Sequence, residues 1–296
     1  MRGPADLLAW RIEFPAVQRT VFLGSHTLAP ASTRTRAAVE RFLTAWETKA
    51  SAERVWFDDA IPEMRRLEGL YARLIGADPA EVALSPSVTT ALSSLGTSLD
   101  YATRNEVVLS RREFPTDQLA WTAMRNRGAR IRWVEGSEAT DYAAAIGGRT
   151  AAVSASRVSY LDAAITDAAA ICAEARGAGA LSVIDDFHGS GCVPIDVKAI
   201  GCDALVCGPY KYLLGSSNVA FVYVRGDVAP RLEPGITGWF AQRNFWAFDG
   251  TRIDWPDSAQ RFTLGTPAVM SVYMAAAGLE IILEVGIERI RERSLE

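Results

Sequence analysis

Short, nearly continuous apolar runs recur along this chain, and segments with a helical pattern separate most of them. Runs without polar alternation are typical of parallel strands buried on both faces, which helical crossovers connect. The pattern therefore predicts an α/β fold, a mostly parallel sheet with helices on both faces. The expected strands are 82–84, 106–110, 130–134, 151–155, 181–184, 204–207 and 219–224, and the expected helices are 33–49, 61–75, 89–99, 117–126 and 167–176.

Residue types that favour helix ends support two of these boundaries. Gly76 follows the helix expected at 61–75, and glycine is the usual residue just after a helix because it adopts the left-handed conformation without steric cost. Thr166 precedes the helix expected at 167–176. A Thr side chain can accept a hydrogen bond from the free N–H groups of a first turn, so we predict Thr166 as the N-cap.

Three regions are expected along the chain. Residues 1–45 are expected to form an N-terminal arm and the first helix, and residues 46–266 the large α/β domain. From Pro267 onward apolar residues recur at helical spacing, which predicts one long helix over 267–296. We expect this helix to lead to a small C-terminal domain that is largely absent from the sequence, either naturally or by truncation.

Composition and charge exclude several classes of protein. The net charge of −4 is not concentrated in blocks, which argues against nucleic acid or an anionic membrane as a partner. No apolar run reaches the roughly 18 residues of a membrane span, and the first residues show no secretory signal. The four cysteines have no paired spacing and the chain has two histidines, so we expect free thiols, no metal site and a cytoplasmic location.

Lysine is rare in this sequence, and one lysine lies where a charge is costly. Of the 31 Lys and Arg residues, three are lysines: Lys49, Lys198 and Lys211. Lys211 lies between the apolar runs 204–207 and 219–224, and removal from water disfavours the charged form of an ammonium group. Lysine, unlike arginine, can lose its proton and become a nucleophilic amine that forms a Schiff base. The alternative is a loop lysine whose ammonium extends to solvent.

An acid precedes this lysine at the end of a neighbouring strand. Asp185 follows the apolar run 181–184, and Lys211 follows the next run along the chain. In a parallel sheet both side chains then lie at the carboxyl ends of strands, where ligands of such sheets bind. An acid beside a ring nitrogen and a lysine that forms a Schiff base are the requirements of a pyridoxal 5′-phosphate site. Turn formation or metal binding by the adjacent acids is the alternative, but His188, three residues on, favours a functional site.

Hydroxyl-bearing residues elsewhere could hold the phosphate of such a cofactor. The segment 85–90 follows a strand and opens a helix, and the N–H groups and hydroxyls at a helix N-terminus form an anion site. Ordinary N-capping by Ser87 or Thr89 is the alternative interpretation. Tyr210, beside Lys211, offers a further hydroxyl to a phosphate or to a substrate atom.

An aromatic residue could cover the cofactor ring. Phe114 follows the strand expected at 106–110 and precedes Pro115 and Asp117. A flat apolar ring in this position could cover one face of a planar cofactor. The alternative is that Pro115 and Asp117 only mark the start of a helix.

Five motifs in sequence order resemble those of a known family. They are Phe-Pro-Thr-Asp at 114–117, Asp-x-x-His at 185–188, Pro-Ile-Asp at 194–196, Tyr-Lys-Tyr-Leu at 210–213 and Gly-Trp-Phe at 238–240. With these motifs the chain resembles fold-type I pyridoxal-phosphate enzymes of the aminotransferase class V group, and it is most similar to kynureninases. The resemblance spans roughly residues 20 to 290.

The resemblance implies a role for each matching residue. Lys211 would form the Schiff base with the cofactor and later move protons at the substrate carbon. Asp185 would pair with the pyridinium nitrogen, and His188 would lie near the phenolic oxygen. Phe114 would stack on the ring, and Asp117 would polarise the ring from the side. The phosphate would be held by Ser87, Val88, Thr89 and Tyr210.

The resemblance also implies an assembly and a substrate contact. Trp239 and Thr266 would reach the phosphate of a neighbouring subunit, which implies a homodimer with shared active sites. Thr266 departs from the kynureninase pattern, which has Asn there, and lies in a Gly-Thr-Pro segment usual in cysteine desulfurases. His26 and Thr27 stand in the arm where kynureninases carry Asn-Ser, so they are candidate substrate-binding residues.

The expected function is that of a pyridoxal-phosphate enzyme acting on an amino-acid substrate. Hydrolytic carbon–carbon cleavage, as in kynureninases, is the first expectation: a hydrated γ-carbonyl loses its acyl group and alanine is released. A class V aminotransferase and a cysteine desulfurase-like lyase are alternatives, although a desulfurase needs a mobile cysteine and all four cysteines fall in the large domain. A further alternative is a non-catalytic scaffold with this fold, or a fragment of a longer enzyme.

Overall fold

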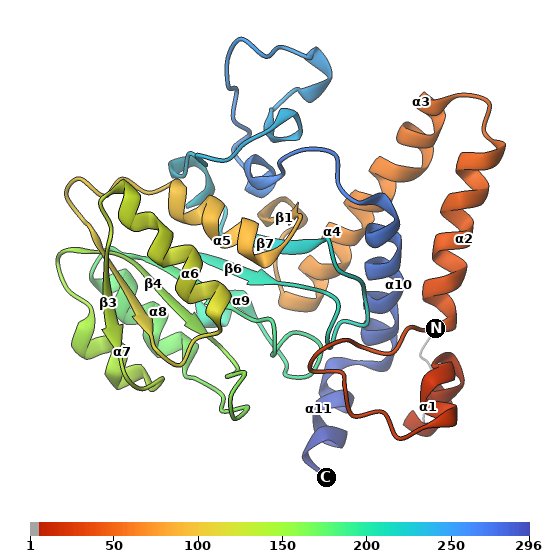
Figure 1. Ribbon diagram of the computed structural model, residues 1–296, viewed down its shortest axis with the longest axis horizontal. Helices are drawn as coiled ribbons and strands as arrows, with labels where there is room; N and C mark the ends of the chain where they lie inside the picture. The colour runs from red at the N-terminus through yellow and green to blue at the C-terminus, as the bar shows by residue number, and fades with distance from the viewer. Residues whose placement is uncertain (1–5) are drawn as a thin grey trace.

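The strands expected from the apolar runs form one sheet in the computed structural model, which describes residues 6–296. The sheet has seven strands in the order β1-β7-β6-β5-β4-β2-β3 (Figure 1). Neighbouring strands run parallel except at β7, which is antiparallel to both β1 and β6. The predicted mostly parallel α/β sheet is therefore confirmed. The strands are β1 (Val82–Ser85), β2 (Glu106–Ser110), β3 (Arg130–Val134), β4 (Thr150–Ser156), β5 (Leu181–Asp185), β6 (Ala204–Cys207) and β7 (Ala220–Val224).

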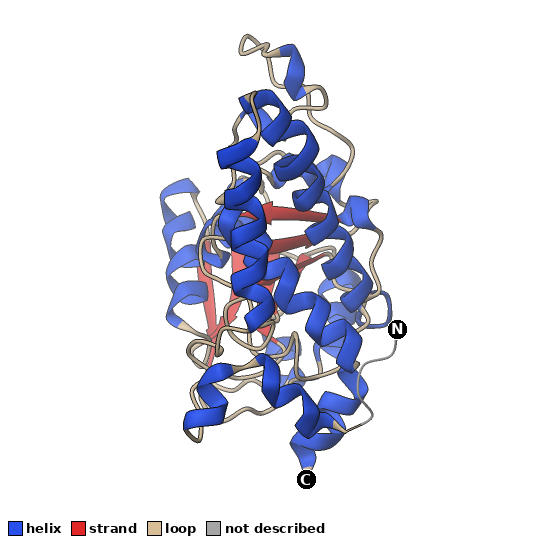
Figure 2. Cartoon of the chain, turned by 90° about the vertical axis from the view of Figure 1, so that its right-hand side faces the viewer, coloured by secondary structure: helices blue, strands red, loops and turns tan. Residues whose placement is uncertain are grey.

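Helices cover both faces of the sheet, which is the middle of three layers (Figures 1 and 2). One face packs against α4, α7, α8, α9 and α10, and the other against α5 and α6. Ile184 and Val183, adjacent on β5, point to opposite layers, as the period of a strand requires. The helices are α1 (Pro15–Arg19), α2 (Thr33–Thr48), α3 (Ala52–Val55), α4 (Ile61–Ile75), α5 (Val88–Thr97), α6 (Pro115–Ala123), α7 (Ala139–Ala145), α8 (Ala168–Gly177), α9 (Val197–Ile200), α10 (Val269–Val285) and α11 (Ile287–Leu295).

Particular side chains set the helix ends. Gly76 ends α4 with φ of 72°, a left-handed conformation in which glycine meets no steric penalty. α8 begins after Asp167, whose carboxylate accepts a hydrogen bond from the N–H of Ala170 at 3.0 Å. The prediction of Thr166 as this N-cap is therefore wrong, because the stronger N-capping residue Asp follows it directly.

The C-terminal tail forms two helices rather than the single helix predicted over 267–296. α10 ends at Gly286, which has φ of 90°, and α11 leaves it at an angle of 74°. The prediction was wrong because the apolar spacing continues across a glycine that the backbone uses to turn. Among residues 6–296 no single helix is long and apolar enough to cross a membrane; α10 and α11 reach that size only as a bent pair.

The N-terminal region is more helical than expected. Leu7–Glu13 forms a 3-10 helix, and α1 follows directly. The boundary expected between residues 45 and 46 falls inside α2, whose Phe42 packs on Tyr273 of α10 with ring centroids 5.1 Å apart. α2 and α4 thus lie beside α10 (Figure 2) and extend the core beyond the sheet.

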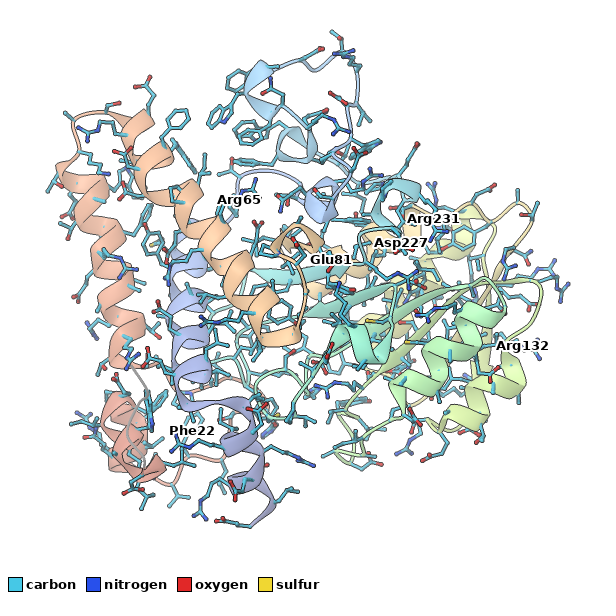
Figure 3. All side chains as sticks on the ribbon, turned by 180° about the vertical axis from the view of Figure 1, so that it is seen from behind. Phe22, Arg65, Glu81, Arg132, Asp227 and Arg231 are labelled. Atoms are coloured by element: carbon cyan, nitrogen blue, oxygen red, sulfur yellow. The ribbon has the colours of Figure 1, made fainter. Side chains whose placement is uncertain are left out.

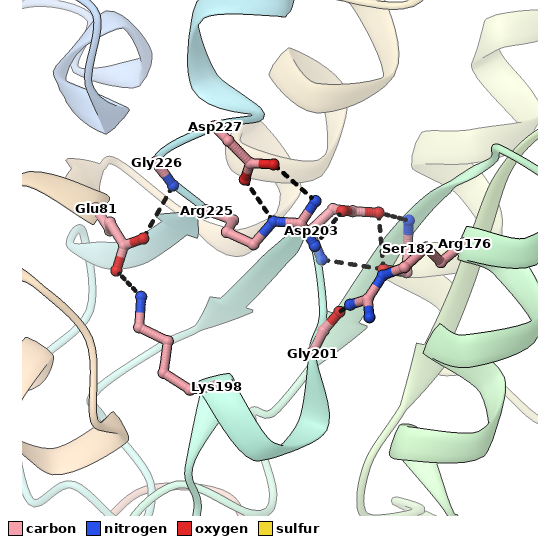
Figure 4. Close-up of polar contacts among 9 residues, drawn as sticks. All are labelled: Glu81, Arg176, Ser182, Lys198, Gly201, Asp203, Arg225, Gly226 and Asp227. Atoms are coloured by element: carbon pink, nitrogen blue, oxygen red, sulfur yellow. Dashed lines mark hydrogen bonds and ion pairs between the residues drawn. The ribbon is translucent and has the colours of Figure 1, made fainter.

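Ion pairs and hydrogen bonds stabilise the edge of the sheet where β5 and β6 begin (Figure 4). Asp203 accepts hydrogen bonds from the N–H and the hydroxyl of Ser182 at 2.8 and 2.9 Å. Arg225, which follows β7, pairs with Asp203 at 3.0 Å and with Asp227 at 2.5 Å. Glu81 accepts a hydrogen bond from the N–H of Gly226 at 2.9 Å. Figure 3, the view from behind, labels Glu81 and Asp227. The acids at this edge therefore have partners.

Candidate active site

Loops at the carboxyl-terminal edge of the sheet surround one cavity of about 200 Å³. Because β1, β2, β5 and β6 share one direction, the loops that follow them leave the sheet at the same edge. Parallel sheets bind their ligands at this edge. The structure brings eight of the predicted site residues to the cavity wall: Ser87, Val88, Thr89, Phe114, Asp185, His188, Tyr210 and Lys211.

Lys211 is buried in the wall of this cavity, with 9% of its surface exposed. Its Nζ lies 2.7 Å from Nε2 of His188 and 4.6 Å from the centre of the Phe187 ring. Burial lowers the pKa of the Lys211 amine, against the opposing effect of the Asp185 charge. Burial also lowers the pKa of His188 to about 4, so its ring is neutral at neutral pH and Nε2 can accept a hydrogen bond from the amine.

Two buried aspartates lie beside each other at this edge of the sheet, and of the two only Asp185 lines the cavity. Asp185 ends β5, and its Oδ1 accepts a hydrogen bond from the N–H of Phe187 at 2.7 Å. Burial raises the pKa of Asp185 to about 7. Neither side-chain oxygen of Asp117 accepts a hydrogen bond from residues 6–296, although Asp117 is 1% exposed, and the carboxyl of Asp185 lies beside it. Burial first, and then the charges of Asp185 and Glu113, raise the pKa of Asp117 well above its usual range.

Glu113, a third buried acid, has partners that Asp117 lacks. Its carboxylate accepts hydrogen bonds from the hydroxyl of Tyr142 at 2.8 Å, from the N–H of Ser156 at 3.1 Å and from the Ser156 hydroxyl. Burial raises the pKa of Glu113, and these donors oppose that shift. Glu113 therefore ties the loop after β2 to the end of β4 and fixes the start of α6, where Phe114 and Asp117 lie.

The N-terminus of α5 faces the cavity. Ser87 is its N-cap, and its Oγ accepts a hydrogen bond from the N–H of Thr90 at 3.0 Å. Ser87 therefore both caps α5 and lines the cavity. Val88 and Thr89 belong to the first turn, whose N–H groups have no intrahelical acceptor, and the helix dipole favours a negative group there.

Aromatic side chains line the cavity on two sides. Phe114, the N-cap of α6, is 39% exposed, and its ring meets Tyr160 edge-on with centroids 5.2 Å apart. The ring of Tyr210 meets Phe187 edge-on at 5.0 Å. Phe114 thus offers an open ring face to a planar ligand.

The other predicted site residues lie outside this cavity. His26 and Thr27 line a second cavity that adjoins it, and the segment is held there by a hydrogen bond from the N–H of Ala29 to the carbonyl of Tyr210 at 2.9 Å. Trp239 is exposed in a group of aromatic rings, and Thr266 is exposed as well. Neither lines the wall of either cavity beside Lys211, so the single chain does not bring them to the site.

Several wall residues were not predicted from the sequence. They are Pro86, Thr116, Ser156, Phe187, Ser217 and Asn218. The polar run 215–218 between Lys211 and β7 was a usable signal, because such runs form loops at strand ends. Asn218 has φ of 63°, which places its side chain in a tight turn at the cavity. Ser156 and Phe187 carried no local signal, since ordinary strand and loop residues become wall residues only through the fold.

These residues fit pyridoxal 5′-phosphate. Lys211 supplies an amine with a lowered pKa, and the N-terminus of α5 suits a phosphate. Asp185, in the cavity wall, suits a protonated ring nitrogen, with Asp117 beside it. A positive charge brought by the cofactor would offset the cost of burying these two acids, and Asp117, which accepts no hydrogen bond from residues 6–296, is the observation that carries the fit.

Comparison with known proteins agrees with this geometry. The family model "Aminotransferase class-V" matches residues 21–296. An uncharacterized aminotransferase of Bacillus subtilis strain 168, YcbU, is 33% identical over 96% of this chain and 75% of its own length. A kynureninase of Burkholderia pseudomallei strain 1106a is 30% identical over 86% of this chain and 61% of its own length. The apo structure of a cysteine desulfurase from Thermococcus onnurineus NA1 shares the fold, with a TM-score of 0.86 and 18% identity over 99% of this chain and 74% of that one.

This chain belongs to the aminotransferase class-V family. It is a pyridoxal-phosphate-dependent enzyme of that class, and the predicted cofactor is confirmed at this level. The chain spans 61% of the length of the kynureninase it matches.

Proposed function

We propose that this enzyme cleaves a carbon–carbon bond of an amino-acid substrate by hydrolysis, as a kynureninase does. The observation that supports the proposal is the set of Asp185, His188 and Lys211 around one cavity, with His188 Nε2 2.7 Å from the amine. Relatives named kynureninase are 30% identical over 86% of the chain and favour this reaction. A non-catalytic scaffold would have no need to bury this set, since each buried charge costs stability.

Different side chains would bind different parts of the cofactor. Lys211 would bind the aldehyde carbon of the cofactor. Asp185, with Asp117 beside it, would bind the ring nitrogen. Phe114 would cover one face of its ring, with His188 near its phenolic oxygen. Ser87, Val88, Thr89 and Tyr210 would hold its phosphate.

The chemistry then depends on proton transfers by the chain. Pyridoxal phosphate, when bound, supplies an electron sink for the charge left at the substrate α-carbon. The Lys211 amine, with its lowered pKa, takes up a proton at the α-carbon and returns it. His188, neutral at neutral pH, accepts a hydrogen bond from Lys211 and orients the amine.

An aminotransferase is the second candidate, and a desulfurase is disfavoured. The relative at 33% identity is named an aminotransferase, which favours return of the proton to the cofactor rather than bond cleavage. A desulfurase needs a cysteine thiolate that reaches the substrate. Cys192, the half-buried cysteine, donates its S–H to the carbonyl of His188 at 3.1 Å, and burial raises its pKa to about 11. A thiol in this state is a poor nucleophile at neutral pH.

The proposal includes an assembly and a location. We propose a homodimer in which Trp239 and Thr266 of one chain reach the cofactor phosphate of the other, because both are exposed and outside the cavity of their own chain. A cytoplasmic location is part of the same proposal, since four free cysteines suit a reducing compartment.

The reaction is tested with three groups of substrates and the cofactor in excess. L-kynurenine is expected to yield alanine and anthranilate, while L-cysteine and pairs of amino donor and keto acid are expected to yield little product. The Lys211→Ala variant is the control and should release no product from any of them. Transfer of the amino group to a keto acid, with no alanine from kynurenine, would replace the proposal with the aminotransferase alternative.

A further inference from the structure

A buried ion pair that the proposed mechanism does not use involves the segment that carries His188. Arg157 follows β4 and Asp186 follows β5, and these two strands are neighbours in the sheet. Nε of Arg157 lies 2.6 Å from Oδ1 of Asp186, and a terminal nitrogen of the guanidinium lies 3.1 Å from Oδ2. The two side chains are 6% and 0% exposed. We call this bidentate contact the buried pair; contacts of this kind hold two groups in one fixed geometry.

The same guanidinium also contacts the far end of the loop 186–194. It donates hydrogen bonds to the carbonyls of Val193 at 3.1 Å and of Pro194 at 3.0 Å. Within the loop, the Asp186 carboxylate accepts a hydrogen bond from the hydroxyl of Ser190 at 2.6 Å, and its carbonyl accepts one from the Ser190 N–H at 2.9 Å. Both ends of the loop therefore contact one guanidinium.

The turn after His188 fits closely between the buried pair and the segment of Lys211. A Cβ atom on Gly189 would clash with the carboxylate of the pair. A Cβ atom on Gly191, which has φ of 94°, would clash with the carbonyl oxygen of Tyr212. Such close approach of main chain to its neighbours is possible only for glycine. A shift of the pair would therefore move the turn that follows the histidine.

The chemistry of a buried ion pair favours a positioning role over a gain in stability. Removing two charges from water costs about as much as their attraction returns, and apolar residues of similar volume often stabilise a protein equally well. The pair differs from an apolar contact in direction, because its hydrogen bonds allow one arrangement of the loop. Its two charges also cancel, so it adds no net charge beside Asp185.

We propose that the buried pair positions the His188 ring against the Lys211 amine, where Nε2 lies 2.7 Å from Nζ. Arg157 and Asp186 are thus positioning residues, and neither lines the cavities beside the amine. The value of this contact for the reaction rests on the proposed function. The placement of the ring does not, because it is a property of the chain without cofactor.

The His188 ring reports its own placement in the chain without cofactor. Burial first, and then the charges of Lys211 and His26, lower the pKa of this ring to about 4, so its NMR signals should shift little between pH 5 and 8. The sequence has two histidines, and the His26→Gln variant therefore assigns the signals. A ring that leaves its place becomes hydrated, and its pKa should rise towards about 6.5.

The main variant joins Arg157→Met to Asp186→Leu, because replacing one residue alone would leave a buried charge without its partner. In this variant the His188 signals should titrate between pH 5 and 8. Arg157→Lys keeps the charge but lacks the forked donors, and it should cause a smaller shift in the same direction. The matched control joins Arg225→Met to Asp203→Leu, which removes an ion pair at the opposite edge of the sheet and should leave the His188 signals unchanged.

Two results would overturn the inference. One is a His188 ring that still does not titrate in the main variant, since the pair would then serve stability alone. The other is an equal shift in the control, because a general loosening of the fold would explain both. Thermal unfolding shows which variants keep the fold; if the main variant does not fold, the presence or absence of a shift in Arg157→Lys decides. Failure of the cofactor to bind Lys211 in the unmodified chain would count against the proposed function instead.

Discussion

At the residue scale, the site is defined by acids that the fold buries without full compensation. Asp203 and Glu81, at the opposite edge of the sheet, have hydrogen bonds and ion pairs. Asp117 accepts no hydrogen bond from the described residues, and Asp185 accepts one from the main chain. Unpartnered buried acids are costly and are found where a ligand supplies the missing charge.

Burying the Asp117 carboxylate in its charged form is costly. Replacing this side chain with a neutral one should therefore stabilise the chain, and the gain should depend on pH. Its pKa is raised in the folded state, so its contribution to stability is fully present below the unfolded pKa of about 4 and is lost as the pH rises. Without cofactor, Asp117→Asn should therefore be more stable than the unmodified chain at pH 8, by about 1–2 kcal/mol, with a smaller gain at pH 5. Urea unfolding at both pH values measures this. Asp203→Asn is the control and should lose stability; a loss in Asp117→Asn would contradict the account.

The open ring face of Phe114 predicts a loss of cofactor affinity on truncation. Phe114→Ala should weaken binding of pyridoxal phosphate about tenfold, because stacking and apolar contact are lost together. Stability should change little, since the ring is 39% exposed. Leu119→Ala, also exposed and outside both cavities, should leave the affinity unchanged. Fluorescence titration with the cofactor measures both variants, and equal affinities would count against stacking.

At the element scale, close packing of α10 positions the segment that carries Lys211. A Cβ atom on Gly278 of α10 would lie 2.4 Å from the carbonyl oxygen of Leu213, two residues after Lys211. Contacts under 3.0 Å with main-chain atoms force a shift of one element. The helix and the loop therefore meet at a position that only glycine allows, and α10 acts as a fixed support for the lysine.

Because α10 supports the segment that carries Lys211, alanine substitutions at two helical glycines should have opposite effects on stability. Gly278→Ala should destabilise the chain by about 1–3 kcal/mol through overpacking and should also weaken cofactor binding. Gly69→Ala on α4 meets no atom within 4 Å and should stabilise the chain by about 0.5–1 kcal/mol, because alanine favours a helix. Chemical denaturation and cofactor titration measure both. A harmless Gly278→Ala would show that the helix and the loop are not in firm contact.

At the scale of the whole molecule, an exposed group of aromatic rings favours assembly. Phe57 stacks on Trp246 with centroids 4.7 Å apart, and Trp239 stacks on Phe248 at 5.8 Å. All four rings are exposed, with Phe248 at 73%. Exposed aromatic residues in one group are typical of protein interfaces, and Trp239 belongs to this one.

The aromatic group predicts that one surface substitution changes both assembly and cofactor binding. Sedimentation should show a dimer for the unmodified chain and a monomer for Trp246→Asp, because a charge in an apolar interface is costly. The monomer should bind cofactor more weakly, since Trp239 and Thr266 would no longer reach the phosphate. Leu119→Asp, exposed on α6, should remain dimeric. A monomeric unmodified chain would contradict the proposed assembly.

The sequence predicts local features of this molecule better than it predicts contacts between distant segments. Strands such as 106–110 and 204–207 were found because an apolar run records burial on both faces directly. The short helices α7 and α9 were missed, since seven and four residues carry little periodic signal. Lys211 and Asp185 stood out by residue type and place. The hydrogen bonds of Glu113 join distant segments, which no local pattern records.

Attachment of pyridoxal phosphate to Lys211 is the measurement that tests this site most directly. The purified chain, given the cofactor, should show a visible absorbance band, and borohydride followed by peptide mapping should place the pyridoxyl group on Lys211. This result is expected because Lys211 is a buried amine with a lowered pKa beside His188. A folded chain that shows no band, or that carries the group on Lys49 or Lys198, would contradict it.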